Sequence, residues 1–214
     1  MYFFDLDGTL LDSNGVWLDI DIEFLGRQGI HPVPEDYTEF VTHNSFSASA
    51  VYTKERFGLS LSTQEIVTCW QDLAREHYAN HLPLKPGAKT LPEALVEKGH
   101  KISIVTSCMP HLCEAALKRH HIHHLFHSIH YSHLMNIEKS DPELFLTIAR
   151  LEELAPEQCI LFDDSPDYLA AAKKAGWQVW GVRDSLFDHR IQEITSVCGP
   201  DQYLQDLSSY IPFL

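Results

Sequence analysis

The chain has 214 residues, 44% of them hydrophobic, which is enough for one moderately large domain or for a core domain with a smaller insertion. Its formal net charge of −14 disfavours broad contact with nucleic acid or with anionic membranes, because both select for basic faces. A small anionic ligand is not excluded, since a metal ion, one lysine and backbone N–H groups can hold it locally.

The first predicted element is a buried strand at residues 2–4, which runs directly into Asp5-Leu6-Asp7-Gly8-Thr9-Leu10. Because side chains alternate along a strand, Asp5 and Asp7 project to the same side, and Gly8 lets the chain turn away after them. Two such carboxylates suit Mg2+, which binds one or two carboxylates together with phosphate oxygens and water. They also suit covalent catalysis, in which one attacks phosphorus and the other exchanges a proton with the leaving oxygen. The alternative for this short motif alone is a solvated turn that ends a strand.

Residues 14–83 contain helical patterns and no convincing strand, and they predict an inserted helical domain. The segment Ser62-Thr63-Gln64-Glu65 fits a capping box at the start of a long helix. Pro83 and Pro86-Gly87 mark the return to the rest of the chain. The apolar stripes of the two long helices are Leu18, Ile22 and Leu25, and Ile66, Trp70, Leu73 and His77.

The remainder of the chain alternates short apolar runs with helical patterns. Asp141-Pro142 is a helix start signal, and Gly176 is a suitable residue for ending a helix. This alternation predicts an α/β fold, a doubly wound parallel sheet covered by helices on both faces. The core domain would comprise residues 1–13 and 84–214, with the helical domain at 14–83. The further strands are predicted at 102–105, 129–131, 159–162 and 179–182.

Three different polar segments lie at or after the ends of these predicted strands. They are Thr106-Ser107, Lys139-Ser140-Asp141-Pro142 and Asp163-Asp164-Ser165. Together with the first acidic motif, they resemble the haloacid dehalogenase-like hydrolase superfamily, in its phosphatase and β-phosphoglucomutase-like branch. The resemblance covers essentially the whole chain and implies a Rossmann-like core with an inserted helical cap domain. One departure is Ser140, where many relatives carry proline.

The resemblance implies a role for each acidic residue. Asp5 would attack phosphorus and bind Mg2+ through its other oxygen. Asp7 would act as general acid and base, and its backbone carbonyl would contact the metal. Asp164 would complete the magnesium site, and Asp163 would do so directly or through water. Because adjacent strand-end side chains point apart, we expect Asp164 to be the more direct ligand.

The resemblance also implies which groups hold the phosphoryl group. Thr106 and the backbone N–H of Ser107 would bind its oxygens. Lys139 would supply positive charge to the phosphoryl group and to Asp5. Lys54 and Arg56 are candidates for contacting a distal anionic group of the substrate, with solvated surface charges as the alternative.

The predicted function is an Mg2+-dependent phosphate monoester hydrolase that acts on a small phosphorylated metabolite through an aspartyl-phosphate. One alternative is a β-phosphoglucomutase-type mutase, which returns the phosphate to a sugar. Another alternative is a binding or regulatory protein that has the fold of the enzyme family but has lost catalytic activity. The intact motifs argue against this alternative. Within the family, Asp7 argues against the dehalogenase and phosphonate-cleaving branches.

Seven of the 14 histidines fall within His120–His133, which raises the hypothesis of a zinc site or a pH sensor. We interpret them instead as parts of a helix end, a loop and a strand of the core. They are His120, His121, His123, His124, His127, His130 and His133.

The five cysteines are odd in number and contain no Cys-x-x-Cys pair, which favours reduced thiols. The chain starts without a basic leader and contains no apolar stretch near twenty residues. We therefore expect a cytoplasmic protein that binds neither nucleic acid nor membranes, with a monomer as the favoured state.

Overall fold

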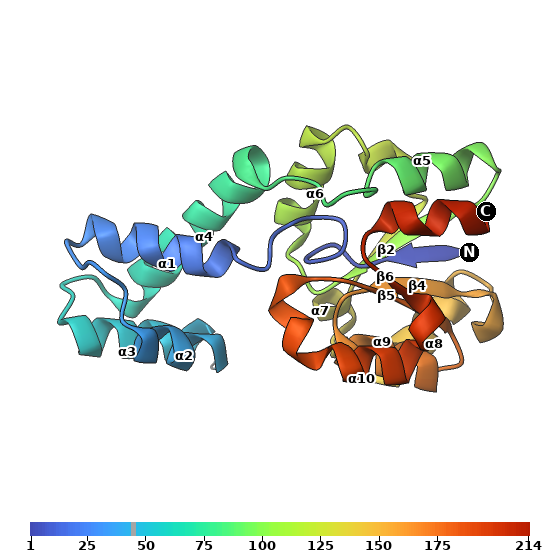
Figure 1. Ribbon diagram of the computed structural model, residues 1–214. Helices are drawn as coiled ribbons and strands as arrows, with labels where there is room; N and C mark the ends of the chain where they lie inside the picture. The colour runs from blue at the N-terminus through green and yellow to red at the C-terminus, as the bar shows by residue number, and fades with distance from the viewer. Residues whose placement is uncertain (44–45) are drawn as a thin grey trace. The chain divides into compact units, whose positions relative to one another are not determined.

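The computed structural model describes residues 1–43 and 46–214, and it divides the chain into two compact units. The core unit comprises Met1–Asn14 and Leu82–Leu214, and the helical unit comprises Gly15–His81. The chain therefore leaves the core unit after Asn14 and re-enters it at Leu82. Both units can be followed by colour in Figure 1.

Within the described part of the core unit, six strands form one all-parallel sheet in the order β3-β2-β1-β4-β5-β6. This confirms the predicted doubly wound fold. The last strand, β6, was not predicted, because two residues are too few to show a periodic pattern. The strands are β1 (Tyr2–Phe4), β2 (Ile102–Thr106), β3 (Ser128–Tyr131), β4 (Ile160–Asp163), β5 (Gln178–Val182) and β6 (Tyr203–Leu204).

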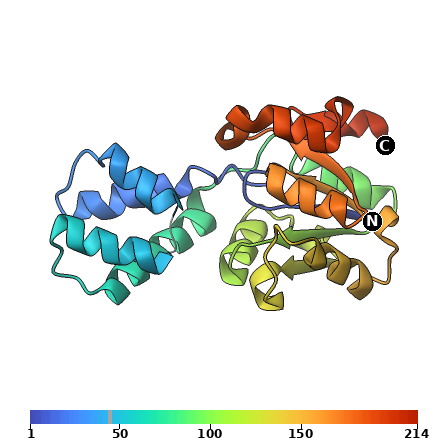
Figure 2. The ribbon, with the colours of Figure 1, turned by 90° about the horizontal axis from the view of Figure 1, so that it is seen from below.

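Helices cover both faces of this sheet (Figure 1). On one face α8, α9 and α10 lie side by side, and Figure 2 looks onto that face. The α-helices of the core unit are α5 (Thr90–Glu97), α6 (Pro110–Arg119), α7 (Ser132–Met135), α8 (Pro142–Leu151), α9 (Pro166–Lys174) and α10 (Ile191–Cys198). Short 3-10 turns are η2 (His123–Leu125), η3 (Pro156–Gln158), η4 (Ser185–Arg190), η5 (Pro200–Gln202) and η6 (Leu207–Phe213).

The alternation of side chains along the strands divides the core into two layers. Phe3, Leu161 and Val179 are buried in a cluster with residues of α8, α9 and α10. On the opposite face, the Phe162 ring stacks on Phe4 with ring centroids 4.9 Å apart. The Tyr210 ring of η6 packs edge-on against Phe162 at 4.8 Å. Both faces of the strands are therefore apolar, as expected for a parallel sheet between helices.

The helical unit consists of α1 (Val16–Arg27), α2 (Glu35–His43), α3 (Phe46–Phe57), α4 (Thr63–Glu76) and the π-helical turn η1 (His77–His81). The predicted capping box is present, because the Ser62 hydroxyl accepts from the Glu65 N–H and the Glu65 carboxylate accepts from the Ser62 N–H. The apolar side of α4 packs on α1, where the Trp70 and Phe24 rings lie 5.8 Å apart.

A polar network is buried within the helical unit. The Tyr37 hydroxyl donates to the Asp21 carboxylate at 3.0 Å and lies 3.1 Å from the Thr53 hydroxyl, which itself donates to the Ser49 carbonyl. Asp21, Tyr37 and Thr53 belong to α1, α2 and α3, so the network joins three helices. Burial raises the pKa of Asp21 to about 6, and the Tyr37 hydrogen bond partly opposes this shift.

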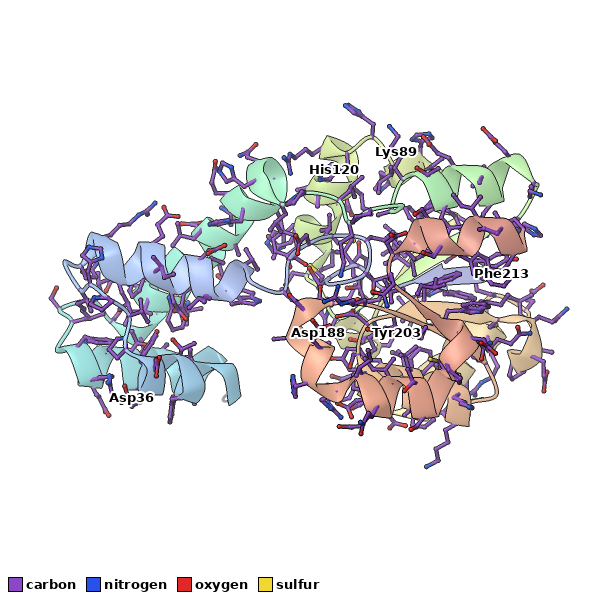
Figure 3. All side chains as sticks on the ribbon, viewed as in Figure 1. Asp36, Lys89, His120, Asp188, Tyr203 and Phe213 are labelled. Atoms are coloured by element: carbon purple, nitrogen blue, oxygen red, sulfur yellow. The ribbon has the colours of Figure 1, made fainter. Side chains whose placement is uncertain are left out.

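The histidine-rich stretch spans the end of α6, η2, β3 and α7. His120, labelled in Figure 3, lies with its Nε2 2.8 Å from the Leu82 carbonyl. His130 is buried and lies 2.8 Å from the Glu152 carboxylate. Among the described residues, no group of three metal-ligating side chains gathers in this stretch. His120 and His130 therefore contact neighbouring elements of the core unit.

All five cysteines are free thiols. No helix in the described ranges has the length and apolar character needed to cross a membrane.

Candidate active site

Two strands at the centre of the sheet position an acidic cluster. The chain runs outward from β1 to β3 on one side and from β4 to β6 on the other, so the strand order reverses between β1 and β4. Asp5 follows β1, and its backbone N–H donates to the Phe162 carbonyl of β4. Asp163 ends β4, and Asp164 follows it. Ligands of open α/β sheets bind at this kind of reversal, beyond the carboxyl ends of the strands.

The structure brings Asp5, Asp163 and Asp164 together, with one carboxylate oxygen of each lying within 4.8 Å of the others. All three residues are buried. Asp163 also accepts a hydrogen bond from the Ser165 N–H at 2.8 Å, which fixes the start of α9. Although adjacent strand-end side chains point apart, the chain turns after β4 and brings both carboxyl groups to the cluster.

Lys139 is the cation of the cluster, and its side chain is only 1% exposed. Its ammonium donates to the Asp5 carboxylate and forms an ion pair with Asp163 at 2.8 Å. Burial alone would lower the pKa of Lys139, but the charges of Asp163 and Asp5 outweigh it and raise that pKa above its ordinary value. Lys139 is therefore a fixed positive charge beside Asp5.

The carboxylates of the cluster carry more negative charge than Lys139 can neutralise. Burial raises the pKa of Asp5, which Lys139 opposes and the neighbouring aspartates increase further. Burial also raises the pKa of Asp164 to about 7, with Asp163 as the next cause. A cluster of buried oxygen ligands with excess negative charge fits a hard divalent cation such as Mg2+. This donor set could therefore hold the magnesium ion that the sequence predicts.

Asp7 lies beside this cluster but does not contribute its carboxylate to it. Its Oδ1 accepts a hydrogen bond from the Ser13 hydroxyl at 2.6 Å. Gly8 follows with a φ of 83°, and a Cβ on it would lie 2.2 Å from both Asn14 Nδ2 and Asp164 Oδ2. Only glycine therefore allows the turn after Asp7 to pass this close to Asp164.

The segment after β2 lies at the neighbouring strand end. Thr106 is buried, and its hydroxyl accepts from the Cys108 N–H at 2.9 Å, which shapes the turn that contains Ser107. Ser107 is exposed, and its hydroxyl accepts from the Ser132 hydroxyl at 3.2 Å. The backbone of this turn can therefore offer N–H donors to an anion.

Tyr168 of α9 lies between this turn and the carboxylate cluster. No role for Tyr168 was predicted from the sequence. Its ring lies under the Lys139 ammonium, with 4.7 Å from Nζ to the ring centroid. Ser107 lies close enough to the Tyr168 hydroxyl to affect the pKa of that hydroxyl. Tyr168 therefore contacts both a predicted phosphate-binding residue and the buried cation.

Further residues around Asp164 were also not assigned a role from the sequence. The Thr9 hydroxyl donates to Asp164 Oδ1 at 3.0 Å, and the Asn14 amide donates to Oδ2 at 2.9 Å. The buried Asp184, after β5, forms an ion pair at 2.7 Å with the half-buried Lys85. Their proximity follows from the strand order, and the only signal along the chain is that Thr9 lies within the first motif and Asn14 lies shortly after it.

Lys54 and Arg56 both have partners inside the helical unit. The Lys54 ammonium donates to the Leu59 and Leu61 carbonyls after the end of α3. Arg56 pairs with Asp36 at 2.8 Å. A contact of either residue with substrate stays a prediction.

Comparisons with known proteins indicate the family and the fold of this chain. A sequence profile described as haloacid dehalogenase-like hydrolase matches residues 2–182. Hexitol phosphatase A of Escherichia coli (strain K12) is 28% identical over 203 residues, covering 92% of this chain and 88% of that protein. The phosphorylated carbohydrates phosphatase of Thermotoga maritima is 23% identical over 186 residues, covering 86% of each chain.

A crystal structure from Thermotoga maritima, provisionally assigned as a β-phosphoglucomutase, superposes with a TM-score of 0.86. It is 21% identical, and the match covers 100% of this chain and 99% of that one. At this identity the likeness shows the fold. The profile match across most of the chain establishes that this protein is an enzyme of the haloacid dehalogenase-like hydrolase family.

Proposed function

We propose that the protein is an Mg2+-dependent phosphate monoester hydrolase that acts through an aspartyl-phosphate on Asp5. The observation that carries this proposal is the placement of Asp5. Its carboxylate lies buried at the strand-order reversal, beside the Lys139 ammonium and the two further carboxylates. A nucleophile for phosphorus needs a neighbouring positive charge to approach an anionic group, and Lys139 supplies it.

Asp5, Asp163 and Asp164 would hold the metal, and the Asp7 backbone carbonyl is the further ligand that the family resemblance implies. When bound, Mg2+ would neutralise charge on the phosphoryl oxygens. Thr106, the Ser107 N–H and Lys139 would hold and orient the same group. These assignments are supported by the position of the named aspartates, Thr106 and Ser107 at or just beyond strand ends of the same sheet. Lys139 lies further along the chain, after α7, and its ion pairs with Asp5 and Asp163 bring it to the same place.

The carboxyl groups of Asp5 and Asp7 would carry out the chemical steps. The Asp5 carboxylate forms a bond to phosphorus as the bond from phosphorus to the leaving oxygen breaks, and Asp7 gives its proton to that oxygen. Asp7 then accepts a proton from water as the water oxygen attacks phosphorus. Inorganic phosphate leaves, and Asp5 returns as a carboxylate. The hydrogen bond from Ser13 holds the Asp7 carboxylate in place between these two proton transfers.

The inserted segment at residues 14–83 would act as a cap that excludes water until the leaving group has departed. The substrate would be a small phosphorylated metabolite. The relatives named for hexitol and carbohydrate phosphates make sugar and polyol phosphates the first class to examine.

The test is a screen of phosphorylated metabolites in Mg2+ buffer that follows inorganic phosphate. We expect release of phosphate from sugar or polyol phosphates and from a generic chromogenic ester, and reversible loss of turnover with EDTA. Turnover that persists in metal-free enzyme would contradict the magnesium assignment. No turnover of any ester would instead favour the alternative of a binding or regulatory protein without catalytic activity.

One further assay separates hydrolase from mutase, because both use the same core residues. The enzyme is given β-glucose 1-phosphate and Mg2+ with and without a bisphosphate primer. We expect free phosphate and little isomerisation. Rapid formation of glucose 6-phosphate with negligible free phosphate would establish the mutase.

A further inference from the structure

Asp184 is a buried acid that the proposed reaction does not use. It follows β5 and is 4% exposed. Its Oδ1 accepts from the Leu186 N–H at 2.9 Å, and its Oδ2 pairs with the Lys85 ammonium at 2.7 Å. The Asn14 amide lies close enough to this carboxylate to lower its pKa. Asp184 therefore interacts with three separate segments of the chain.

Two of these segments are the connections between the units. Asn14 is the last residue of the core unit before the chain leaves it, and Lys85 follows soon after the chain returns at Leu82. Besides Asp184, the Lys85 ammonium donates to the Gly8 carbonyl at 2.6 Å and to the Arg183 carbonyl at 2.7 Å. An ammonium has three donors, so these contacts use all of them. Asp184 and Lys85 thus link the segment at Asn14, where the chain leaves the core unit, and the segment at Lys85, where it returns, to the turn after Asp7.

The same network reaches the proposed metal site through Asn14. The Asn14 amide donates to Asp164 Oδ2, while Thr9 donates to Oδ1, so one donor on each oxygen fixes the plane of this carboxylate. Each carboxylate oxygen carries two lone pairs, so a hydrogen-bonded oxygen can still bind a cation. Groups that orient a metal ligand in this way affect metal affinity without touching the metal.

We propose that Asp184 is a positioning residue for Asp164. It acts through Asn14, and together with Lys85 it holds both connections between the units, so that metal binding and the conformation of these connections are coupled. This inference rests on the proposed magnesium site and adds a group to it that neither touches the substrate nor binds the metal.

The test measures Mg2+ binding by titration calorimetry on the substrate-free enzyme. Asp184→Asn keeps the shape of the side chain but must turn an NH2 group toward one of its donors, and Asn14→Ala removes the bridge to Asp164. We expect each variant to bind Mg2+ about 10-fold more weakly than wild type. Because Asp184 acts through Asn14, the double variant should bind no more weakly than the weaker-binding single variant.

Asp188→Asn is the matched control, because Asp188, labelled in Figure 3, lies on η4 close in sequence to Asp184. Asp188 pairs with Arg183 at the surface. We expect Asp188→Asn to bind Mg2+ as wild type does. Wild-type affinity in Asp184→Asn would overturn the inference while leaving the magnesium site intact. Multiplying effects in the double variant would also overturn it, because they would indicate that Asp184 and Asn14 act on Mg2+ binding independently. Absence of Mg2+ binding by wild type would overturn the proposed function together with this inference.

Hydrogen exchange tests the coupling to the connections. In wild type, Mg2+ should slow exchange in residues 12–16 and 82–86, and in Asn14→Ala this slowing should be largely lost. Far-ultraviolet circular dichroism at the same temperature would verify that the variant is folded. Equal slowing of both segments in the two proteins would contradict the coupling, whatever the Mg2+ affinities.

Discussion

Asp5, Asp163 and Lys139 are buried, and Lys139 forms ion pairs with both carboxylates. Removing any one of the three residues would take an ion-pair partner away from a buried charge. Removing water from a charge costs several kcal/mol, on the order of what an ion pair of good geometry returns. The raised pKa of Asp5 shows that this compensation is incomplete, since burial and the neighbouring carboxylates together outweigh Lys139. The site is therefore prepared for a further positive charge, which is the physical basis for the proposed metal.

Replacement of Asp5, the proposed nucleophile, is the most direct test of the aspartyl-phosphate mechanism. Asp5→Asn should lower kcat by at least about three orders of magnitude, because it removes both the attacking oxygen and a metal ligand. A phosphate-release assay with a chromogenic ester measures this loss. Asp12→Asn is the matched control, because Asp12 is an exposed acid of the same segment and should leave kcat near wild type. Activity of Asp5→Asn close to wild type would refute the mechanism.

Tyr168 gives a second prediction for single residues, because its ring and its hydroxyl contact different groups. A cation over an aromatic face contributes about 1 kcal/mol, so Tyr168→Leu should lower kcat/KM roughly 5-fold or more by loosening Lys139. Tyr168→Phe keeps the ring and should lower kcat/KM less. Steady-state kinetics on both variants compare the two contacts. Equal loss in both would assign the effect to the hydroxyl instead of the ring.

The elements that were predicted correctly are those whose signal lies within a short stretch of chain. The strands β1, β2, β4 and β5 each form one apolar run, so their positions could be predicted to within one or two residues, and the motifs that follow them were found with them. β6 has only two residues and carries no such pattern. The Asn14, Lys85 and Asp184 network was not predicted, since its members meet only after the strands have taken their order in the sheet.

The helices α1, α2 and α3 give a prediction about pH, because the buried Asp21 network joins them. The pKa of Asp21 is raised from the ordinary value of 3.8 to about 6, so between these values the folded state binds a proton that the unfolded state has released. Its contribution to stability is therefore complete below about pH 4 and is lost as the pH rises through about 6. At about 1.4 kcal/mol for each pKa unit, this loss amounts to about 3 kcal/mol.

Asp21→Asn should remove this dependence, since a neutral amide still accepts the Tyr37 hydrogen bond. Urea unfolding at pH 4.5 and pH 7.5, followed for wild type and variant, measures the difference in the free energy of unfolding. We expect the variant to gain stability relative to wild type at the higher pH. A constant difference between the two proteins at both pH values would show that Asp21 keeps an ordinary pKa.

The core unit and the helical unit should be stabilised independently, one by Mg2+ and the other by a substitution at Asp21. The carboxylate cluster lies entirely in the core unit, and the Asp21 network lies entirely in the helical unit. A ligand that binds only the folded state stabilises it by mass action, by about 2.7 kcal/mol at a concentration 100 times its Kd. Mg2+ should therefore stabilise the core unit, and the Asp21→Asn substitution at pH 7.5 should stabilise the helical unit.

Peptide-resolved hydrogen exchange can follow both units of the same full-length chain. Mg2+ should slow exchange in peptides from β1, β4 and α9, and Asp21→Asn should slow it in peptides from α1, α2 and α3, because local opening reports the stability of each unit separately. Asp164→Asn should abolish the response to Mg2+ and leave the response to Asp21→Asn unchanged. If Mg2+ slowed exchange equally in both units, the chain would unfold as one cooperative whole, and the stability of the helical unit would then depend on occupancy of the carboxylate cluster.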